Sequence, residues 1–148
     1  FMRGFVQNII LRRAVPFTGT AGVQFVSLTP ERVEVRLANE HRVRNHIGSV
    51  HASAMNLLAE TATGMAVGMN VRDDCLPLAK ELSMAFKKRA TGALKAVATL
   101  TAEQRAAMQA SDKGEVQVKV TVTDETGVEP VECAFTWAWV PSSRPAKN

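Results

Sequence analysis

The chain has 148 residues, of which 46% are hydrophobic and 22% are charged, and its formal net charge is +4. This size and composition predict one globular domain over 1–148, and two cysteines are too few for a disulfide-built scaffold. The positive charge favours anionic partners. We expect a phosphate-bearing small ligand rather than nucleic acid, because the chain lacks tyrosine and its few aromatic residues lie in apolar patterns.

The sequence also carries information on the compartment. It contains no apolar run near the roughly 20 residues that cross a bilayer, and its amino end lacks a secretory leader pattern. The two cysteines, Cys75 and Cys133, lack metal-ligand spacing. We therefore expect a soluble, cytoplasmic protein with reduced thiols and no membrane partner.

The first elements form a helix and a hairpin. Apolar residues at helical spacing predict an amphipathic helix over 2–15 that packs on the body of the protein and ends before Pro16. After a turn at 19–22, alternating residues predict strands over 23–28 and 32–38.

A long helix over 50–69 is the predicted centre of the domain. Its apolar residues gather on one broad face, and a polar stripe occupies another. The stripe consists of Ser53, Asn56, Glu60 and Thr63. Two glycines four residues apart, Gly64 and Gly68, favour close packing against a neighbouring element.

Four strands complete the predicted sheet. After a polar turn at 73–74, they are expected over 78–88, 93–100, 116–122 and 131–140, with a short helix at 101–110 and a polar tail at 141–148. In the first of these strands, one face is expected to carry Leu78, Lys80, Leu82, Met84 and Phe86. The fold class is therefore α+β, with a six-stranded antiparallel sheet wrapped around one long central helix.

Three features of this pattern resemble a known family. They are Asn45-x-x-Gly48-x-x-His51 before the central helix, the acid Glu60 nine residues after that histidine, and a following strand that ends in an aromatic residue and a basic turn. The sequence resembles the hotdog-fold acyl-CoA thioesterases of the phenylacetic-acid-pathway type and their uncharacterised DUF4442-like relatives. The resemblance covers nearly the whole chain and implies the hotdog fold.

The resemblance also implies roles for individual residues. Glu60 would act as nucleophile or general base, Asn45 would help hold the thioester carbonyl or the attacking water, and the N–H of Ala52 would polarise the carbonyl. Apart from the resemblance, His51 could donate a hydrogen bond to the substrate carbonyl. The family commonly has two glycines where this chain has Ala52-Ser53, which leaves less space beside that donor. The resemblance implies dimers whose sites lie between two subunits. We therefore expect a homodimer or a dimer of dimers that needs no metal or cofactor, with coenzyme A entering as part of the substrate.

Each of these residues also has a simpler interpretation. Glu60 fits a solvated or salt-bridged helix face, Asn45 fits a loop residue that satisfies local backbone, and His51 fits a helix cap. A metal site is not expected, because the five-residue spacing of His41, His46 and His51 does not place them on one helix face.

The expected substrate-binding residues flank the central helix in sequence. Lys87, Lys88 and Arg89 would meet the phosphates of coenzyme A, although an ordinary charged strand end explains them equally well. Gly48 and Ser83 complete the set, and Ser83 would approach the site from a second subunit.

The predicted function is hydrolysis of an acyl-CoA or acyl-carrier thioester. One alternative is a catalytically silent acyl-CoA or lipid-binding module on the same fold. Another is a hotdog dehydratase, which would need a histidine and an acid set closely together. The sequence has neither a Gly-x-Ser-x-Gly elbow nor a glycine-rich phosphate loop, which disfavours an α/β-hydrolase or a nucleotide-cofactor enzyme.

Overall fold

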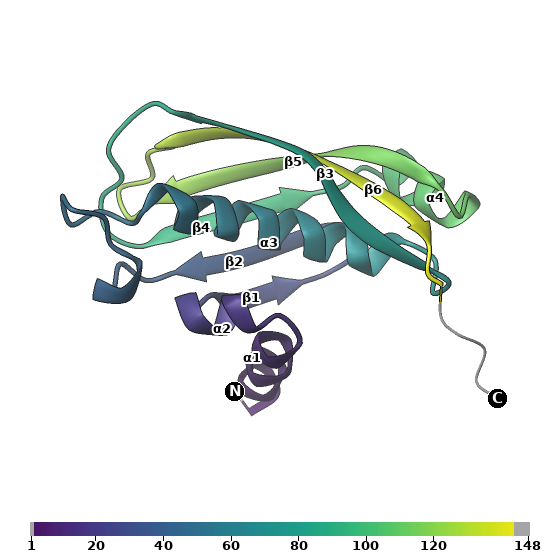
Figure 1. Ribbon diagram of the computed structural model, residues 1–148, viewed down its shortest axis with the longest axis horizontal. Helices are drawn as coiled ribbons and strands as arrows, with labels where there is room; N and C mark the ends of the chain where they lie inside the picture. The colour runs from purple at the N-terminus through teal and green to yellow at the C-terminus, as the bar shows by residue number, and fades with distance from the viewer. Residues whose placement is uncertain (1, 144–148) are drawn as a thin grey trace.

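A single antiparallel sheet wraps around one long helix in this computed structural model, which describes residues 2–143 (Figure 1). The helix is α3 (Ala52–Asn70), and the six strands lie in the order β1-β2-β4-β5-β6-β3. Their bounds are β1 Gln24–Leu28, β2 Arg32–Leu37, β3 Cys75–Phe86, β4 Leu94–Thr99, β5 Gly114–Asp124 and β6 Val131–Pro141. This confirms the predicted α+β class. Most of the predicted polar tail, residues 144–148, lies outside the described residues.

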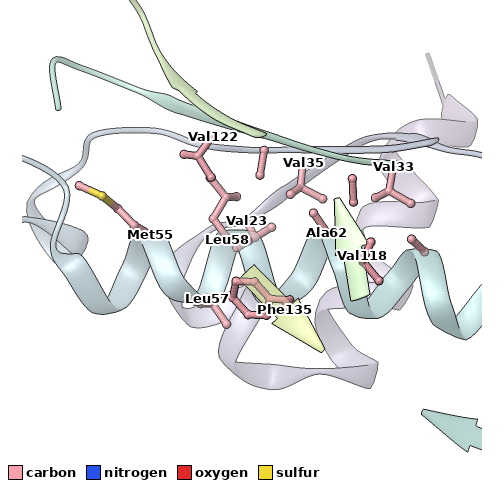
Figure 2. Close-up of a cluster of buried hydrophobic side chains, with 14 of the residues drawn as sticks. Val23, Val33, Val35, Met55, Leu57, Leu58, Ala62, Val118, Val122 and Phe135 are labelled. Atoms are coloured by element: carbon pink, nitrogen blue, oxygen red, sulfur yellow. The ribbon is translucent and has the colours of Figure 1, made fainter. Parts of the chain in front are cut away.

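The core fills the space between α3 and the concave face of the sheet. Alternation in β2 and β4 points every second side chain toward the helix, as a strand period of two requires. Small residues on α3 let the helix lie close to the sheet: Ala59, Ala62 and Ala66 are fully buried. Figure 2 shows Leu58 from α3, Val33 and Val35 from β2 and Phe135 from β6 within this cluster.

Close packing of α3 occurs at only one of its two glycines. A Cβ at Gly64 would lie 2.7 Å from the ring of Trp137, whereas the nearest atom to a Cβ at Gly68 would be 3.9 Å away. Thr63 does not belong to the predicted polar stripe, because it is fully buried and its Oγ1 accepts a hydrogen bond from the Trp137 Nε1–H at 2.9 Å. The prediction of close packing is therefore confirmed at Gly64, and the placement of Thr63 was wrong.

Two helices rather than one precede the sheet. The first, α1 (Met2–Ala14), matches the prediction, but the predicted turn at 19–22 belongs largely to a second helix, α2 (Pro16–Ala21). Pro16 opens α2 because its fixed φ suits the first turn of a helix and its missing N–H needs no acceptor there. Gly22, with φ +81°, ends the helix in the left-handed region that glycine adopts without strain.

The face on which α1 contacts the body differs from the prediction. Four of its large apolar side chains are exposed rather than packed, and only Leu11 is partly buried against the core within the described helix: the exposed residues are Phe5, Val6, Ile9 and Ile10. The helix is held by its polar side instead. Asn8 Nδ2 donates to the carbonyl of Phe25, the N–H of Phe25 donates to Asn8 Oδ1, and Arg12 Nε donates to the carbonyl of Val23 at 2.7 Å. Because β1 is an edge strand, these side chains supply partners for edge backbone groups that no further strand reaches.

The other edge strand, β3, contains a bulge that breaks its predicted face. The register against β6 shifts between Ala79 and Glu81, which leaves Lys80 as an extra residue. Leu82 lies opposite the buried Phe135 on the core side, whereas Leu78 lies opposite Ala138 on the outer side. The expectation that residues 78–86 share one face is therefore wrong, because one inserted residue reverses the alternation.

The remaining segments agree with the sequence. Helix α4 (Ala102–Ala110) begins with a capping box between Thr101 and Gln104, and the short 3₁₀ helix η1 (His41–Val43) leads toward α3. None of the helices within residues 2–143 has the length and hydropathy that crossing a membrane requires.

Candidate active site

The loop before α3 is organised by Asn45. Its Oδ1 accepts hydrogen bonds from the N–H groups of Ile47 and Ser49 at 3.0 and 3.1 Å, and its own N–H donates to the Ser49 carbonyl at 2.8 Å. Gly48, with φ +78°, makes the tight turn within this loop. Asn45 thus makes the local backbone hydrogen bonds that its simpler interpretation as a loop residue predicts. Its Nδ2 group has no hydrogen-bond partner among residues 2–143.

The start of α3 presents hydrogen-bond donors. His51 is the N-cap, and its Nδ1 accepts from the N–H of Ser53 at 3.0 Å. Because Nδ1 accepts, a neutral imidazole carries its hydrogen on Nε2, on a side chain that is exposed. The N–H of Ala52 also lacks an acceptor within the described part of the chain, as is normal in a first helical turn. The helix start therefore offers one backbone and one side-chain donor where the helix dipole is positive.

Glu60 lies about two and a half turns further along α3. It is half-buried, and its carboxylate makes neither a hydrogen bond nor an ion pair with any residue that the structure describes. Burial raises the pKa of Glu60 above its ordinary value, because the charged form loses water without gaining a donor or a cation. This environment differs from the salt-bridged surface position that the sequence left open, and it is typical of a carboxyl group tuned toward proton transfer.

A cavity of about 180 Å³ lies beside Glu60. Its walls are mainly apolar and come from both ends of the chain: Leu11, Val15, Phe25, Met65, Pro77 and Trp137. Glu60 is the only titratable residue in the lining. The contributions of α1, α2 and β6 to this site were not predicted from the sequence. Gly64, against which Trp137 of β6 packs, was a local signal for the last of them.

The structure does not bring Glu60 and the helix-start donors into one cavity. A second cavity of about 240 Å³ lies at the start of α3, between His51 and Ala54 on one side and Phe17 of α2 on the other. Neither Asn45 nor Ala52 lines the cavity beside Glu60. Eight residues at 1.5 Å each separate Ala52 from Glu60 by roughly 12 Å along the helix axis. Within one chain Glu60 therefore borders one cavity, whereas His51 borders the other and Ala52 lines neither.

Of the predicted substrate-binding residues, Arg89 lies nearest to the Asn45 loop. Its Nη2 donates to the carbonyl of Ile47 at 2.6 Å and its Nε donates to Ser49 Oγ at 3.1 Å, so it fastens this loop to the segment after β3. Lys87 lies 3.7 Å from the carboxylate of Glu132 and is exposed, as is Lys88. Ser83 is exposed on the face of β3 that points away from α3. The structure does not gather these residues around Glu60.

Other reactive groups provide no second catalytic centre. Within residues 2–143 no group of three or more His, Cys, Asp or Glu side chains is arranged to hold a metal ion. Burial raises the pKa of the Cys133 thiol to about 11, so it is protonated at neutral pH and is a poor nucleophile. Among the described residues, Glu60 is therefore the best candidate for a catalytic group.

An antiparallel six-stranded sheet wrapped around one helix, with an isolated acid on that helix, defines a protein of the hotdog class. The family described as a domain of unknown function, DUF4442, matches residues 5–140, and the chain belongs to this family. Comparison with curated proteins gives no match.

Solved structures confirm the predicted hotdog fold. A Pseudomonas aeruginosa protein of unknown function, described as a "probable thioesterase", is 25% identical, with a TM-score of 0.83 over 93% of this chain and 95% of its own. A Haemophilus influenzae thioesterase is 13% identical, with a TM-score of 0.72 over 88% of this chain and 87% of its own. A mutant thioesterase of Staphylococcus aureus is 16% identical, with a TM-score of 0.73 over 84% of this chain and 98% of its own.

Because the buried carboxylate of Glu60 has no partner in the described chain, we expect its ionisation to lower the free energy of unfolding. Glu60→Gln keeps the shape of the side chain but removes the charge, so we expect the variant to have a higher free energy of unfolding than wild type at neutral pH. The pKa of Glu60 is raised in the folded state. Wild type therefore loses stability as the pH rises from the ordinary glutamate range through the folded pKa, and the loss is complete above it.

Urea denaturation of both proteins checks this expectation. The two should be equally stable below pH 4.5, the ordinary value for glutamate, and should diverge at neutral pH. Equal stability at both pH values, or a variant weaker than wild type at neutral pH, would mean that the carboxylate has a stabilising partner in solution.

Proposed function

We propose that this protein is a thioesterase that hydrolyses acyl thioesters of coenzyme A or of an acyl carrier, with Glu60 as general base or nucleophile. The observation that carries the proposal is a half-buried carboxylate on the central helix, beside an apolar cavity and without a partner in the described chain. Fold neighbours that are named thioesterases support the same chemistry. The protein needs no metal or cofactor in this mechanism.

The chemistry assigns distinct tasks to the acid and to the donors. As a base, Glu60 takes a proton from water while the water oxygen attacks the thioester carbonyl carbon. The resulting oxyanion is stabilised by the Ala52 N–H and the His51 Nε2–H at a helix start. The carbon–sulfur bond then breaks, the leaving sulfur takes the proton from Glu60, and a carboxylic acid and a free thiol are released. If Glu60 attacks directly, a mixed anhydride forms first and water hydrolyses it.

A complete site requires a second copy of the chain. Neither His51 nor Ala52 of the same chain lines the cavity beside Glu60. Strand β3 is a sheet edge of 12 residues with exposed apolar side chains, including Phe86 at 53% exposure. A long apolar edge of this kind favours pairing with another strand. We infer that two β3 strands join two sheets, so that Glu60 acts on a carbonyl held at the partner's helix start, in a dimer or a dimer of dimers.

Recognition of coenzyme A is assigned to the exposed basic residues that follow β3. Lys88 and Lys87 carry flexible ammonium groups suited to phosphates, whereas the donors of Arg89 are already used to hold the Asn45 loop. In this proposal Asn45 shapes the loop with its Oδ1 and offers its Nδ2 to the substrate. Gly48 provides the turn, and Ser83, on the face of β3 that points away from α3, would act only on the site of a second subunit.

Hydrolysis of a substrate panel tests the proposal. Wild-type protein is mixed with acetyl-, hexanoyl-, phenylacetyl- and palmitoyl-CoA and with acyl carrier protein thioesters, and free thiol is followed with a colorimetric reagent. We expect turnover of at least one thioester at about 1 s⁻¹ or faster, in the ordinary range for enzymes. Tight acyl-CoA binding without thiol release would instead establish the silent binding module. Loss of water from 3-hydroxyacyl-CoA without thiol release would establish a dehydratase.

A further inference from the structure

The cavity beside Glu60 is closed on one side by residues that precede the sheet. Leu11 of α1, Val15 between the two helices and Thr18 of α2 form this wall. Leu11 lies in sequence between Asn8 and Arg12, whose side chains hydrogen-bond to the backbone of Phe25 in β1 and of Val23 just before it. The wall is therefore held in place by directional bonds to the sheet, and Figure 1 shows both helices beside β1.

The opposite wall is equally well fixed. The Nε1–H of Trp137 donates to Thr63 Oγ1 at 2.9 Å, and its ring lies against Gly64, where a Cβ would be only 2.7 Å away. Phe25, which completes the enclosure from β1, is 5% exposed and bonded to Asn8 through its backbone. A cavity with walls held in this way is preformed, as is usual for binding sites of small ligands.

We propose that this cavity binds the acyl group of the substrate, and that Leu11 and Val15 limit the size of that group. The inference rests on the proposed thioesterase function, because Glu60 would then act on the carbonyl at the cavity's edge. Its volume is about 180 Å³. An apolar cavity of roughly 150 Å³ is known to hold benzene, so the volume here suits one aromatic ring or a chain of about six carbons.

The lining also defines the chemical character of the acyl group. Apart from Glu60 and two threonines the lining is apolar, and the Thr18 hydroxyl already donates to the Val15 carbonyl at 2.7 Å. An anionic acyl group would lose its water beside the unpaired carboxylate of Glu60, at a high cost in free energy, and a cationic one would pair with that carboxylate and remove the base from the reaction. The substrate class is therefore a neutral aromatic or medium-chain acyl thioester, because a longer chain would extend beyond the roughly 180 Å³ of the cavity.

Substitution of Leu11 changes the cavity without touching Glu60. Leu11→Trp fills the space, and we expect kcat/KM for hexanoyl- and phenylacetyl-CoA to fall by about tenfold or more, while acetyl-CoA changes by less than about threefold. Leu11→Ala enlarges the space and should move the preference toward longer chains. Ile10→Trp and Ile10→Ala are the matched controls, because Ile10 is the neighbouring residue of α1, is 59% exposed and does not line this cavity.

A binding measurement that needs no turnover separates this inference from the proposed function. Phenylacetamide, a neutral analogue of an acyl group, is titrated into wild type, Leu11→Trp and Ile10→Trp by ligand-observed NMR, and only Leu11→Trp should lose binding. If thioesters are hydrolysed but the Leu11 variants behave like the Ile10 controls, or palmitoyl-CoA is the best substrate, the acyl cavity is wrong while the thioesterase stands. If no thioester is hydrolysed but Leu11→Trp abolishes phenylacetamide binding, the cavity stands as a binding site and the thioesterase falls.

Discussion

Glu60→Gln is expected to lower kcat/KM for the best thioester by about a hundredfold or more, the size of effect that follows from losing a positioned base or nucleophile. The amide occupies the same space but cannot accept a proton from water. We expect KM to change little, because the apolar walls of the cavity remain. Steady-state kinetics measure both constants. Glu103→Gln is the matched control, since Glu103 is an exposed carboxylate on α4, away from the β3 edge.

The pH profile supplies a signature that a structural role would not give. The base must be ionised, and burial raises the pKa of Glu60, so wild-type kcat/KM should rise with pH through a midpoint above 4.5, the ordinary value for glutamate. The variant should lack this ascending limb. A loss of less than about threefold in Glu60→Gln, with an unchanged profile, would remove Glu60 from the chemistry.

Mixed subunits test whether the acid and the donors come from different chains. Ala52→Pro removes one N–H at the first helical position, where proline is tolerated, and His51 has the extended ψ of 144° that a following proline requires. Equal mixing of inactive Glu60→Gln and Ala52→Pro subunits should restore about a quarter of wild-type activity, because half of the dimers are mixed and each contains one intact site. No recovery after subunit exchange would place both groups in one chain.

Phe135→Ala is expected to cost about 3–5 kcal/mol in the free energy of unfolding, the range for removing a buried aromatic ring from a packed core. Phe135 is fully buried on β6 and belongs to the cluster between α3 and the sheet (Figure 2). The loss is a large part of the roughly 5–15 kcal/mol that holds a typical domain folded. Urea denaturation of wild type and variant measures it.

The control for this effect is a phenylalanine outside the core. Phe5 on α1 is 67% exposed, so Phe5→Ala should change the free energy of unfolding by no more than about 0.5 kcal/mol. Similar losses in both variants would mean that the apolar face of α1 is covered in solution, whereas a small loss in Phe135→Ala would contradict the core position of β6.

Much of the fold was predictable because its signals are local. The helical period of residues 50–69 and the alternation in β2, β4 and β5 each depend on neighbours within a few positions, so the sequence alone indicated the central helix and the six strands. The motif from Asn45 to Glu60 could be identified in the same way. Local signals were also present but misread at Pro16 and Gly22, which begin and end α2.

Tertiary contacts decided which faces these elements use. Hydrophobicity predicted that α1 would bury its apolar side chains, yet the edge of β1 supplied backbone groups that Asn8 and Arg12 could satisfy. In β3 a single extra residue, Lys80, reversed the alternation beyond it. Neither result is encoded in periodicity, because each depends on the partner element and its register.

In the candidate site, too, local features were predictable from the sequence and long-range contacts were not. The sequence by itself determined that an acid lies on the central helix and that a capped helix start precedes it. Only the tertiary structure decided that Glu60 has no cationic partner in the described chain and borders a cavity whose walls include Leu11 and Trp137. The physical reason is that desolvation, and with it the raised pKa of Glu60, comes from side chains that are distant in sequence and meet only when the sheet closes around α3.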